Sequence, residues 1–437
     1  MNPETIAALG TPAGTGALAV IRLSGPDCLA LCRNIFGRSP TPRVATRGYF
    51  RDQNGRIVDD VLFTYFAGPK SYTGEDVLEI TAHGNPYIAQ RILEDLAGRG
   101  ARPAEPGEFT RRAFLNGKLD LTQAEAVMDL ISARSERALV AAQKQLRGAL
   151  SREMDGLSRA LITALAKIEA YIDFPEEDLP PENRAEVLAS VEKILAGTSR
   201  LLATQHYGEL LRDGVAVAIV GEPNAGKSSL LNRLVGRDRA IVSEKPGTTR
   251  DFLEERLMVG PHLFRLIDTA GLNENPGEIE RLGIQKTWER VREADIVLLL
   301  VDATAPLPHF LDDLVKYRPL IASNKCDERP AHPRTLAVSA LTGFGTEALL
   351  AALVVRADAL QPDLGNEAIA INARHALALS SARECLTAAA EKLRGPHDPA
   401  LLASDLRGAL DAFGQIGGKI DHERVLDELF RTFCIGK

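Results

Sequence analysis

The sequence predicts a multidomain protein of α/β plus all-α type, in which a doubly wound α/β domain is inserted into a discontinuous helical domain. From Val215 to about Val355, short apolar strands alternate with helical patterns, which is typical of a parallel sheet with helices on both faces. Long helical patterns precede and follow this region, so we expect them to join as one domain. A different pattern, rich in Gly, Pro and short β-branched runs, occupies residues 1–118.

The first 118 residues are predicted to form a mixed α/β domain. Residues 17–21, 61–65 and 77–80 are short apolar runs typical of strands, and residues 87–96 have a helical pattern.

Helices are predicted from Lys118 onward. The segment Thr122-Gln123-Ala124-Glu125 has capping-box spacing and predicts a helix that begins at Thr122. An apolar stripe from Leu139 to Ile172, with no proline before Pro175, predicts long helices. Further helices are predicted over 183–204, 368–393, 399–413 and 422–433. The expected segments are therefore 1–118 (N-terminal domain), 119–210 (first helical part), 211–360 (inserted α/β domain) and 361–437 (second helical part).

Composition excludes several classes of protein. The 437 residues are 45% hydrophobic and 25% charged, which is ordinary for a globular chain and excludes a fibrous or disordered one. The net charge of −7 argues against a protein held on nucleic acid by bulk charge, so RNA contact must be local or shared with a partner. The odd number of cysteines, the acidic start and the absence of a long apolar run predict a cytoplasmic enzyme without a membrane span.

A phosphate-binding loop follows the first strand of the inserted domain. The apolar strand 215–220 runs directly into Gly221-Glu222-Pro223-Asn224-Ala225-Gly226-Lys227-Ser228, which fits G-x-x-x-x-G-K-S, and a helical pattern follows from Ser229. Such a loop surrounds phosphate oxygens with backbone N–H groups. We expect Lys227 to neutralise phosphate charge and the Ser228 hydroxyl to coordinate Mg²⁺. The strand–loop–helix context favours this site over a chance glycine turn.

A second motif indicates which base is bound. The strand 319–323 ends in Asn324-Lys325-Cys326-Asp327, which resembles the N-K-x-D guanine motif of GTPases. The Asp327 carboxylate can accept from both N1–H and the 2-amino group of guanine, donors that adenine lacks. Downstream, Ser339-Ala340-Leu341 resembles the weaker S-A-K motif, with Leu341 in place of lysine. Alone, N-K-x-D is more often an ordinary polar turn; after a phosphate loop it indicates GTP.

Two switch elements complete the nucleotide site. The strand 264–268 ends in Asp268-Thr269-Ala270-Gly271, a D-x-x-G motif in which Asp268 can hold Mg²⁺ through water and the Gly271 N–H can bind the γ-phosphate. Upstream, Gly247-Thr248-Thr249 supplies Thr249 as a second hydroxyl on Mg²⁺. Small GTPases place a water-orienting Gln directly after D-x-x-G, but Leu272 stands there and no arginine finger is evident. Another group must orient the attacking water.

Several motifs in one chain resemble the tRNA-modification GTPase family MnmE/TrmE. They are G-E-P-N-A-G-K-S-S (221–229), G-T-T-R-D (247–251), D-T-A-G-L (268–272) and the terminal F-C-I-G-K (433–437). The stretches 106–121 and 71–76 match the family as well, so the resemblance covers the whole chain.

The resemblance implies potassium-dependent GTP hydrolysis by a Ras-like domain, when two such domains of a homodimer meet. It places K⁺ at Asn224, Ser243, Lys245 and Thr248, and it assigns the water-positioning carboxylate to Glu280, although Glu278 is a competing choice and a solvated helix charge is the plain alternative. The residues expected to contact GTP are Asn224, Ala225, Gly226, Lys227, Ser228, Ser229, Ser243, Glu244, Lys245, Pro246, Gly247, Thr248, Thr249, Asp268, Thr269, Ala270, Gly271, Asn324, Lys325, Asp327, Ser339, Ala340 and Leu341.

The resemblance also implies an N-terminal site for 5-formyl-tetrahydrofolate. Its positions are Arg22, Glu79, Lys118 and the terminal Lys437, which without the resemblance would be plain surface charges. Cys434 is a candidate nucleophile by position, and a small packed thiol is an equal alternative.

The function implied is the addition of a carboxymethylaminomethyl or aminomethyl group at C5 of the wobble uridine of certain tRNAs. The expected partner is the FAD- and NADH-dependent protein MnmG (GidA), in a heterotetramer. A ribosome-assembly GTPase of the same phosphate-loop class is the alternative, and the N-terminal domain and F-C-I-G-K tail argue against it. A purely structural scaffold is disfavoured by the phosphate loop.

Overall fold

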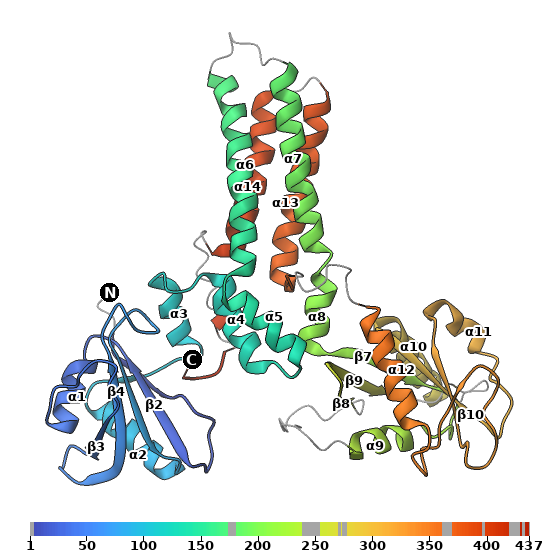
Figure 1. Cartoon of the computed structure of the whole chain (residues 1–437), viewed down its shortest axis with the longest axis horizontal. Coiled ribbons are helices and arrows are strands. Elements are labelled where there is room, and N and C mark those ends of the chain that lie inside the picture. Colours follow the sequence, from blue (N-terminus) through green and yellow to red (C-terminus); the bar gives the residue numbers. More distant parts are fainter. Residues whose placement is uncertain are drawn as a thin grey trace. The chain divides into compact units, whose positions relative to one another are not determined.

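The computed structural model is organised as two compact units (Figure 1). The first comprises Met1–Met128, Leu146–Asp155 and Phe413–Lys437, and the second Asp129–Gln145 and Gly156–Ala412. The structure describes residues 4–173, 181–237, 254–269, 272, 278–360, 369–395, 398–418, 429–430 and 433–436.

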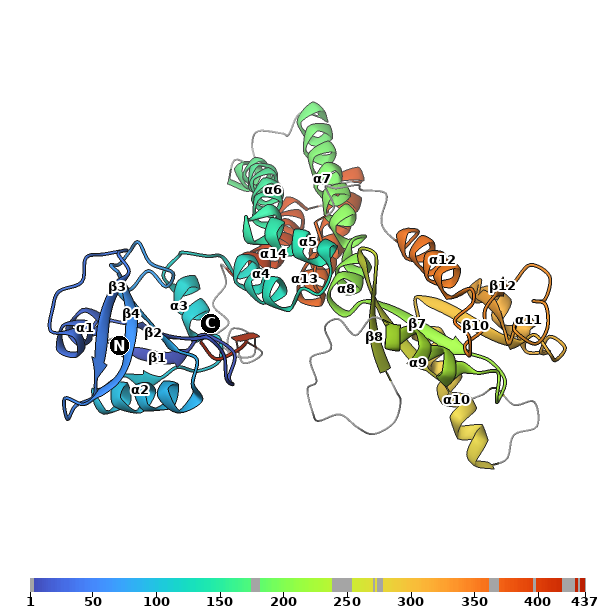
Figure 2. The same cartoon turned by 60° about the horizontal axis from the view of Figure 1, so that its bottom comes forward.

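The first unit contains a six-stranded sheet in the order β3-β4-β5-β2-β1-β6, antiparallel except for the parallel pair β1–β6. Successive side chains of β1 point to opposite faces of the sheet and enter two different cores. Ala7 packs with α1 and α2, whereas its neighbours Ile6 and Ala8 pack with Phe109 of α3. This confirms the predicted mixed α/β domain, and Figure 2 shows α1 and α2 beside the sheet. The elements are β1 (Ile6–Leu9), β2 (Leu18–Ser24), α1 (Cys28–Phe36), β3 (Thr46–Arg51), β4 (Ile57–Phe66), β5 (Val77–His83), α2 (Pro86–Gly98), β6 (Arg102–Pro103) and α3 (Glu108–Leu115).

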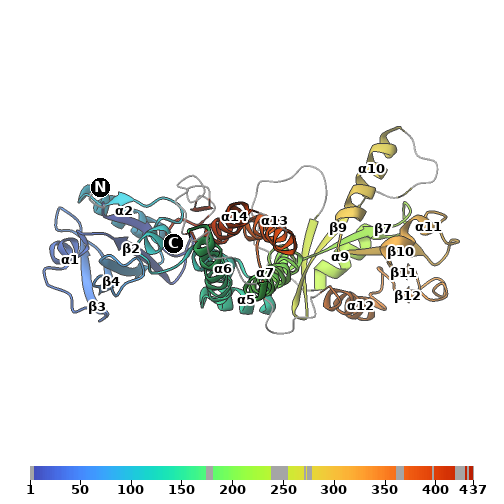
Figure 3. The same cartoon turned by 90° about the horizontal axis from the view of Figure 1, so that it is seen from above.

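Long helices before and after the second sheet pack together, as the sequence predicts (Figure 3). Arg184 of α7 donates to the carbonyl oxygen of Leu393 in α13 at 2.9 Å, and Arg407 of α14 pairs with Glu169 of α6 at 2.7 Å. The helices are α4 (Leu121–Ser132), α5 (Glu136–Leu146), α6 (Ala149–Asp173), α7 (Pro181–Leu202), α8 (Gln205–Asp213), α13 (Ala373–Arg394) and α14 (Pro399–Gly417). None of the helices in the described ranges is long and apolar enough to cross a membrane.

The second sheet has the order β12-β11-β10-β7-β9-β8 and is parallel except for the edge strand β8. Val217 and Ile219 of β7 pack with α9 and α12, whereas Ala218 and Val220 pack with α10, so helices cover both faces (Figure 3). The elements are β7 (Val215–Val220), α9 (Lys227–Arg237), β8 (Glu254–Val259), β9 (His262–Asp268), α10 (Glu278–Glu293), β10 (Ile296–Asp302), α11 (Leu311–Leu314), β11 (Leu320–Asn324), β12 (Leu336–Ala337) and α12 (Thr346–Asp358).

One local prediction in the helical region, the helix cap at Thr122, is wrong. Helix α4 begins at Leu121, because Asp120 forms the cap: its Oδ1 accepts from the Gln123 N–H at 2.9 Å, and Gln123 Oε1 accepts from the Asp120 N–H at 3.0 Å. Thr122, the predicted cap, is buried within the helix. The apolar stripe is divided between α5 and α6 by Gly148, whose φ of 78° lies in the left-handed region.

Other predictions lie outside the described residues. They concern the second-switch segment 243–249, Ala270, Gly271, Lys437 and most of the helix over 422–433. The division into four segments stays a prediction.

Candidate functional site

The loop between β7 and α9 has the backbone of a phosphate cradle. Asn224 and Gly226 have φ values of 62° and 92°, which turn successive N–H groups toward the same side. Glycine is required at two points of the loop: a Cβ on Gly221 would lie 2.3 Å from the Leu300 carbonyl oxygen, and one on Gly226 would lie 2.2 Å from Asn324 Nδ2. The two glycines therefore let the loop pack closely on β10 and on Asn324. The N–H groups of such a loop add to the dipole at the start of α9.

Lys227 is the buried cation of this loop. Its Nζ donates to the carbonyl oxygens of Gly221 at 3.1 Å and Glu222 at 2.9 Å. Burial lowers the pKa of the ammonium, and the negative charges of Asp268 and Glu222 act in the opposite direction. Since its hydrogen-bond partners are neutral carbonyl groups, the charge of Lys227 remains available to an anion in the loop.

Ser228 and Asp268, which are predicted to hold Mg²⁺ directly and through water, are hydrogen-bonded to each other. Ser228 Oγ donates to Asp268 Oδ2 at 2.7 Å, which joins the start of α9 to the end of β9. The other oxygen, Asp268 Oδ1, is buried and accepts no hydrogen bond from the described residues. A buried carboxylate oxygen without a donor fits a cation or its water shell. Thr269 anchors the same strand end, because its hydroxyl donates to the Ile219 carbonyl oxygen at 2.7 Å.

Asn324 connects the base motif to the phosphate loop. Its Nδ2 donates to the Ala225 carbonyl oxygen at 2.8 Å, and its Oδ1 accepts from the Ala340 N–H at 2.9 Å. The side chain is buried, with 3% of the residue exposed. Through this one amide, the phosphate loop, the N-K-x-D motif and the S-A-L motif are held at the carboxyl edge of the sheet, where parallel α/β sheets bind ligands.

Two further residues of the predicted base site, Asp327 and Leu341, are exposed. Asp327 is exposed, and none of the hydrogen bonds found in the described part of the chain uses its carboxylate. Leu341 is 75% exposed, so the position that carries lysine in the S-A-K motif offers an apolar surface here. Its backbone is held by Arg233 of α9, which donates to the carbonyl oxygens of Ala340, at 3.0 Å, and Leu341. Ser339 is buried, and its Oγ accepts from the Thr342 N–H at 3.1 Å, closing this turn.

Asp302, at the end of β10, is a site residue that sequence reasoning missed. Its Oδ2 pairs with Lys325 Nζ at 2.5 Å, and Lys325 has a left-handed backbone with φ of 63°. Burial would raise the pKa of the Asp302 carboxyl, but the Lys325 ammonium and the Thr304 hydroxyl and N–H hold it below the usual range. The sequence did contain a signal for this residue, because Asp302 is an acid at the end of an apolar strand, where parallel sheets bind ligands.

Leu272, which follows the D-x-x-G motif, belongs to the core. It is 3% exposed and packs with Val220, Leu299 and Val291, while its N–H donates to the Gly221 carbonyl oxygen at 3.0 Å. The backbone of Leu272 thus holds the start of the phosphate loop, and its apolar side chain supplies no polar atom for water.

Two further predicted residues lie in the first turns of helices α9 and α10. Ser229 is exposed in the first turn of α9, directly after Ser228. Glu280 lies in the first turn of α10, and its side chain is outside the described residues. Its water-positioning role therefore stays a prediction.

In the first unit, Arg22 and Glu79 are partners across strands β2 and β5. Arg22 Nη2 lies 2.8 Å from Glu79 Oε1, and the two side chains are 24% and 28% exposed. The guanidinium also lies over the rings of Tyr72 and Phe109, with 5.7 and 5.8 Å to the ring centroids. Lys118, by contrast, donates to the Pro69 carbonyl oxygen at 3.0 Å, and no contact between it and the Arg22–Glu79 pair is found among the described residues.

The C-terminal tail reaches this pair. Ile435 forms a β-bridge with Pro106, and Arg22 Nη1 donates to the Gly436 carbonyl oxygen at 3.5 Å. Gly436 fits closely, because a Cβ there would lie 2.3 Å from the Leu9 carbonyl oxygen. Cys434 is exposed. The tail segment 433–436 thus lies beside the predicted N-terminal site.

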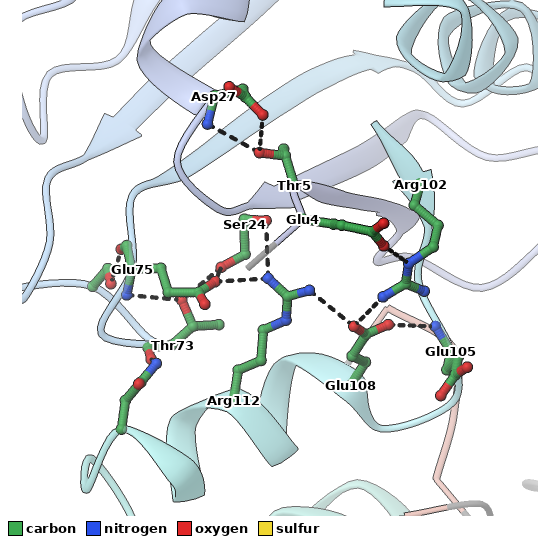
Figure 4. Close-up of polar contacts among 12 residues, drawn as sticks. Glu4, Thr5, Ser24, Asp27, Thr73, Glu75, Arg102, Glu105, Glu108 and Arg112 are labelled. Carbon is green, nitrogen blue, oxygen red and sulfur yellow. Dashed lines mark hydrogen bonds and ion pairs between the residues drawn. The ribbon is translucent and has the colours of Figure 1, made fainter. Parts of the chain in front are cut away.

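A partly buried ion network joins the two N-terminal stretches that resemble the family (Figure 4). Arg112 of α3 pairs with Glu75 and with Glu108, each at 2.9 Å, and Arg102 pairs with Glu108 at 2.5 Å. The Ser24 hydroxyl also donates to the Glu75 carboxylate, at 2.7 Å. These stretches, 71–76 and 106–121, therefore hold α3 against the sheet.

The second sheet and its carboxyl edge define a P-loop GTPase: a glycine-rich loop at a helix N-terminus, an acid at the end of β9 and a guanine motif at the end of β11. The chain matches the MnmE helical domain over residues 121–434 and the N-terminus of the GTP-binding protein TrmE over residues 5–118. It belongs to the tRNA modification GTPase family MnmE, which confirms the predicted family.

Similar proteins agree over the full length. The tRNA modification GTPase MnmE of Opitutus terrae is 54% identical and 99% of each chain is covered. The protein of the same name from Akkermansia muciniphila is 45% identical, with 100% of each chain covered. Among solved structures, the G domain of the T. maritima FeoB iron transporter is 28% identical with a TM-score of 0.27, covering 33% of this chain and 98% of that one.

Proposed function

We propose that this chain is a potassium-dependent GTP hydrolase that modifies tRNA. With a flavin-dependent partner, it adds a carboxymethylaminomethyl or aminomethyl group at C5 of the wobble uridine of certain tRNAs, using 5-formyl-tetrahydrofolate as the one-carbon source. The full-length similarity to tRNA modification GTPases supports this function. The protein acts in the cytoplasm as a homodimer, joined by MnmG in a heterotetramer.

The observation that carries the nucleotide assignment is the bridge made by Asn324. One buried amide contacts the Ala225 carbonyl oxygen and the Ala340 N–H, so it sets the distance between the phosphate loop and the base motif. The exposed Asp327 carboxylate then accepts from guanine, and Leu341 packs against the base. The doubly wound arrangement fits this placement, because β7 and β11 lie on either side of β10.

Mg²⁺ fits the residues present at the phosphate end. Ser228 and Thr249 would hold the ion, and the unpaired Asp268 Oδ1 would accept from its water shell. A bound Mg²⁺ neutralises charge on the transferred phosphoryl group. The chain's own contribution is to orient the phosphates through the loop N–H groups and Lys227.

Leu272 cannot position the attacking water, so another residue must do so. Because Leu272 is packed in the core, we assign the attacking water to Glu280 at the start of α10. K⁺ would be held by Asn224, Ser243, Lys245 and Thr248. Asn224 suits this role, since it carries an amide oxygen and is an exposed residue with a left-handed backbone in the phosphate loop.

The folate site is proposed at Arg22 and Glu79, with Lys118 and Lys437. The donor set fits a pterin: Glu79 can accept from amide and amino N–H groups, Arg22 can donate to carboxylate or carbonyl oxygens, and the exposed Tyr72 ring supplies aromatic surface. When bound, the folate supplies the one-carbon unit. The chain's residues bind and orient it, and the Gly436 carbonyl oxygen of the tail accepts a hydrogen bond from Arg22 beside this site.

Nucleoside analysis of tRNA from cells lacking this protein tests the function. We expect the C5-modified wobble uridines to disappear and to return with the wild-type gene, but not with an Asp327→Asn variant when GTP is the nucleotide available. Unchanged wobble uridines together with abnormal ribosomal subunits would contradict the proposal and favour a ribosome-assembly GTPase.

A further inference from the structure

A concave basic surface on the first unit lies away from the Arg22–Glu79 pair. It is a cavity of about 560 Å³ between the end of α1 and the edge strand β3, and it is here called the β3 groove. Its lining includes three arginines and two aromatic rings: Arg38, Arg47, Arg51, Phe36 and Tyr49. None of these residues has a role in GTP binding or in the proposed folate site.

The charge of this segment is opposite to that of the whole chain. Residues 33–56 contain six arginines and one acid, Asp52, whereas the chain carries a net charge of −7. Asp52 does not offset them at the surface, because its side chain is 7% exposed and accepts from the N–H groups of Asn54 and Arg56. The segment is therefore a local basic patch of the kind that an acidic protein needs for contact with a polyanion.

Most of these arginines have no acidic partner in the part of the chain that the structure describes. Arg38 donates to the Arg47 carbonyl oxygen and Arg51 to the Gly55 carbonyl oxygen, so both are positioned by neutral groups. Within the described residues, Arg47 alone of the six pairs with a carboxylate, that of Asp60 at 2.5 Å. Positive charge that is held in place but not neutralised favours binding of an anion.

The spacing of the side chains indicates an extended ligand. Arg47, Tyr49 and Arg51 alternate along the edge strand and are exposed, while Phe50 between them is buried and packs against Phe36 with ring centroids 6.4 Å apart. Arg47 and Arg51 are four residues apart, which in a strand is about 13 Å, too far to hold one phosphate together. Tyr49, half exposed between them, offers a ring for stacking.

We propose that the β3 groove is an RNA-binding surface, in which Arg38, Arg47 and Arg51 contact backbone phosphates and Tyr49 stacks on a base. The inference rests on the proposed function, under which the RNA is the substrate tRNA. Arginine and aromatic side chains that alternate along one strand are the combination that binds single-stranded or looped RNA. The Asp60 carboxylate orients the Arg47 guanidinium and offsets part of its charge, so Arg38 and Arg51 carry most of the attraction.

The test is binding of unfractionated tRNA to the full-length protein over a range of KCl concentrations. We expect the Arg38→Ala/Arg51→Ala variant to bind about 10-fold more weakly and to lower the slope of log Kd against log salt by about 1.5 to 2, one unit or slightly less for each phosphate that is no longer neutralised. Arg394→Ala/Arg407→Ala is the charge-matched control, since both side chains are 57% exposed on α13 and α14. It should change neither quantity.

Variants at Tyr49 distinguish the contribution of stacking to tRNA binding from that of charge. Tyr49→Ala should weaken tRNA binding by about 5-fold or more with an unchanged salt slope, whereas Tyr49→Phe should bind as the wild type does. Inorganic pyrophosphate should displace tRNA no better than KCl at equal ionic strength, and stronger displacement would identify a site for a compact phosphate instead.

Three results of the tRNA titrations would also overturn the inference: no tRNA binding by the wild type at low salt, equal weakening in the groove and control variants, or no weakening in either. GTP turnover, measured in parallel, should be unchanged in every groove variant. If the wild type hydrolyses GTP and supports wobble modification but the groove variants bind tRNA normally, the inference fails while the proposed function stands. Loss of wobble modification is measured separately, so the two failures remain distinct.

Discussion

Asn324 Nδ2 donates a hydrogen bond to the Ala225 carbonyl oxygen over 2.8 Å, and this bond ties the guanine motif to the phosphate loop. The same amide accepts from the Ala340 N–H, so three motifs of the site depend on one buried side chain. A Cβ on Gly226 would lie 2.2 Å from the same Nδ2, which shows how closely the loop and the amide are fitted. The two ends of the nucleotide site are thus one hydrogen-bonded structure.

Asn324→Ala should therefore weaken GDP and GTP alike. The variant cannot form the two buried hydrogen bonds and leaves two backbone groups without partners, which we expect to cost about 2 kcal/mol, or ~30-fold in affinity. Titration with a fluorescent GDP analogue would measure it. Glu328→Ala, an exposed change four residues on, is the control. Unaltered affinity of the Asn324 variant would show that the bridge does not support binding.

Asp327→Asn should change the base preference. The amide can no longer accept from both guanine donors, so GTP should bind more weakly by a few kcal/mol while xanthosine triphosphate gains affinity. Nucleotide competition measures both. The adjacent Glu328→Gln removes a neighbouring exposed carboxylate and should leave the preference unchanged. A variant at Asp327 that still prefers GTP would remove this residue from the base site.

Turnover in the wild type should depend on the monovalent cation. With Leu272 in the core and no glutamine after Gly271, we expect hydrolysis in K⁺ to exceed that in Na⁺ by about 10-fold or more at equal ionic strength, since Na⁺ is too small for the same oxygen cage. Asn224→Ala should abolish the difference, whereas Asn232→Ala, exposed on α9, should preserve it. Equal wild-type rates in the two salts would end the potassium hypothesis.

The phosphate loop and both strand-end motifs could be predicted because their residues are adjacent in sequence and each follows an apolar strand. The hydrogen bond between Asn324 and Ala225 could not be predicted, because it depends on the order of the strands in the sheet. Strands β7 and β11 are both neighbours of β10, and this order brings their carboxyl ends close to each other. The Lys325–Asp302 pair was missed for the same reason. A sequence shows which strands end in polar residues, but not which strand ends are neighbours.

The N-terminal pair illustrates the same limit for an antiparallel sheet. Arg22 and Glu79 are 57 residues apart, and they meet because β2 and β5 are in the register that places them opposite each other. The family resemblance named both residues, but no periodicity indicated that they would pair. Local turn chemistry also escaped prediction: the cap at Asp120 competes with the similar pattern at Thr122, and only the hydrogen bonds distinguish them.

Glu280→Ala should separate catalysis from binding. If Glu280 orients the attacking water, the variant should bind GTP as the wild type does, while turnover falls by ~10²–10⁴. Glu278→Ala is the matched control, because it changes another carboxylate two residues away, on a different face of α10. Single-turnover hydrolysis in K⁺ would decide, and a large loss confined to the Glu278 variant would show that the other glutamate positions the water.

The ion network around Glu108 predicts how the N-terminal domain responds to acid. Burial would raise the pKa of the Glu108 carboxyl, but Arg102, the Glu105 N–H and Arg112 outweigh it and hold the pKa below its usual range. A carboxyl whose pKa is lowered by folding stabilises the fold above its unfolded pKa of about 4.3, and that contribution is lost as pH falls through the folded pKa. Urea unfolding between pH 7 and about pH 3 should therefore show wild-type stability falling more steeply below about pH 4.3 than that of Glu108→Gln, which cannot titrate there. Parallel pH curves for the two proteins would contradict a stabilising, ionised Glu108.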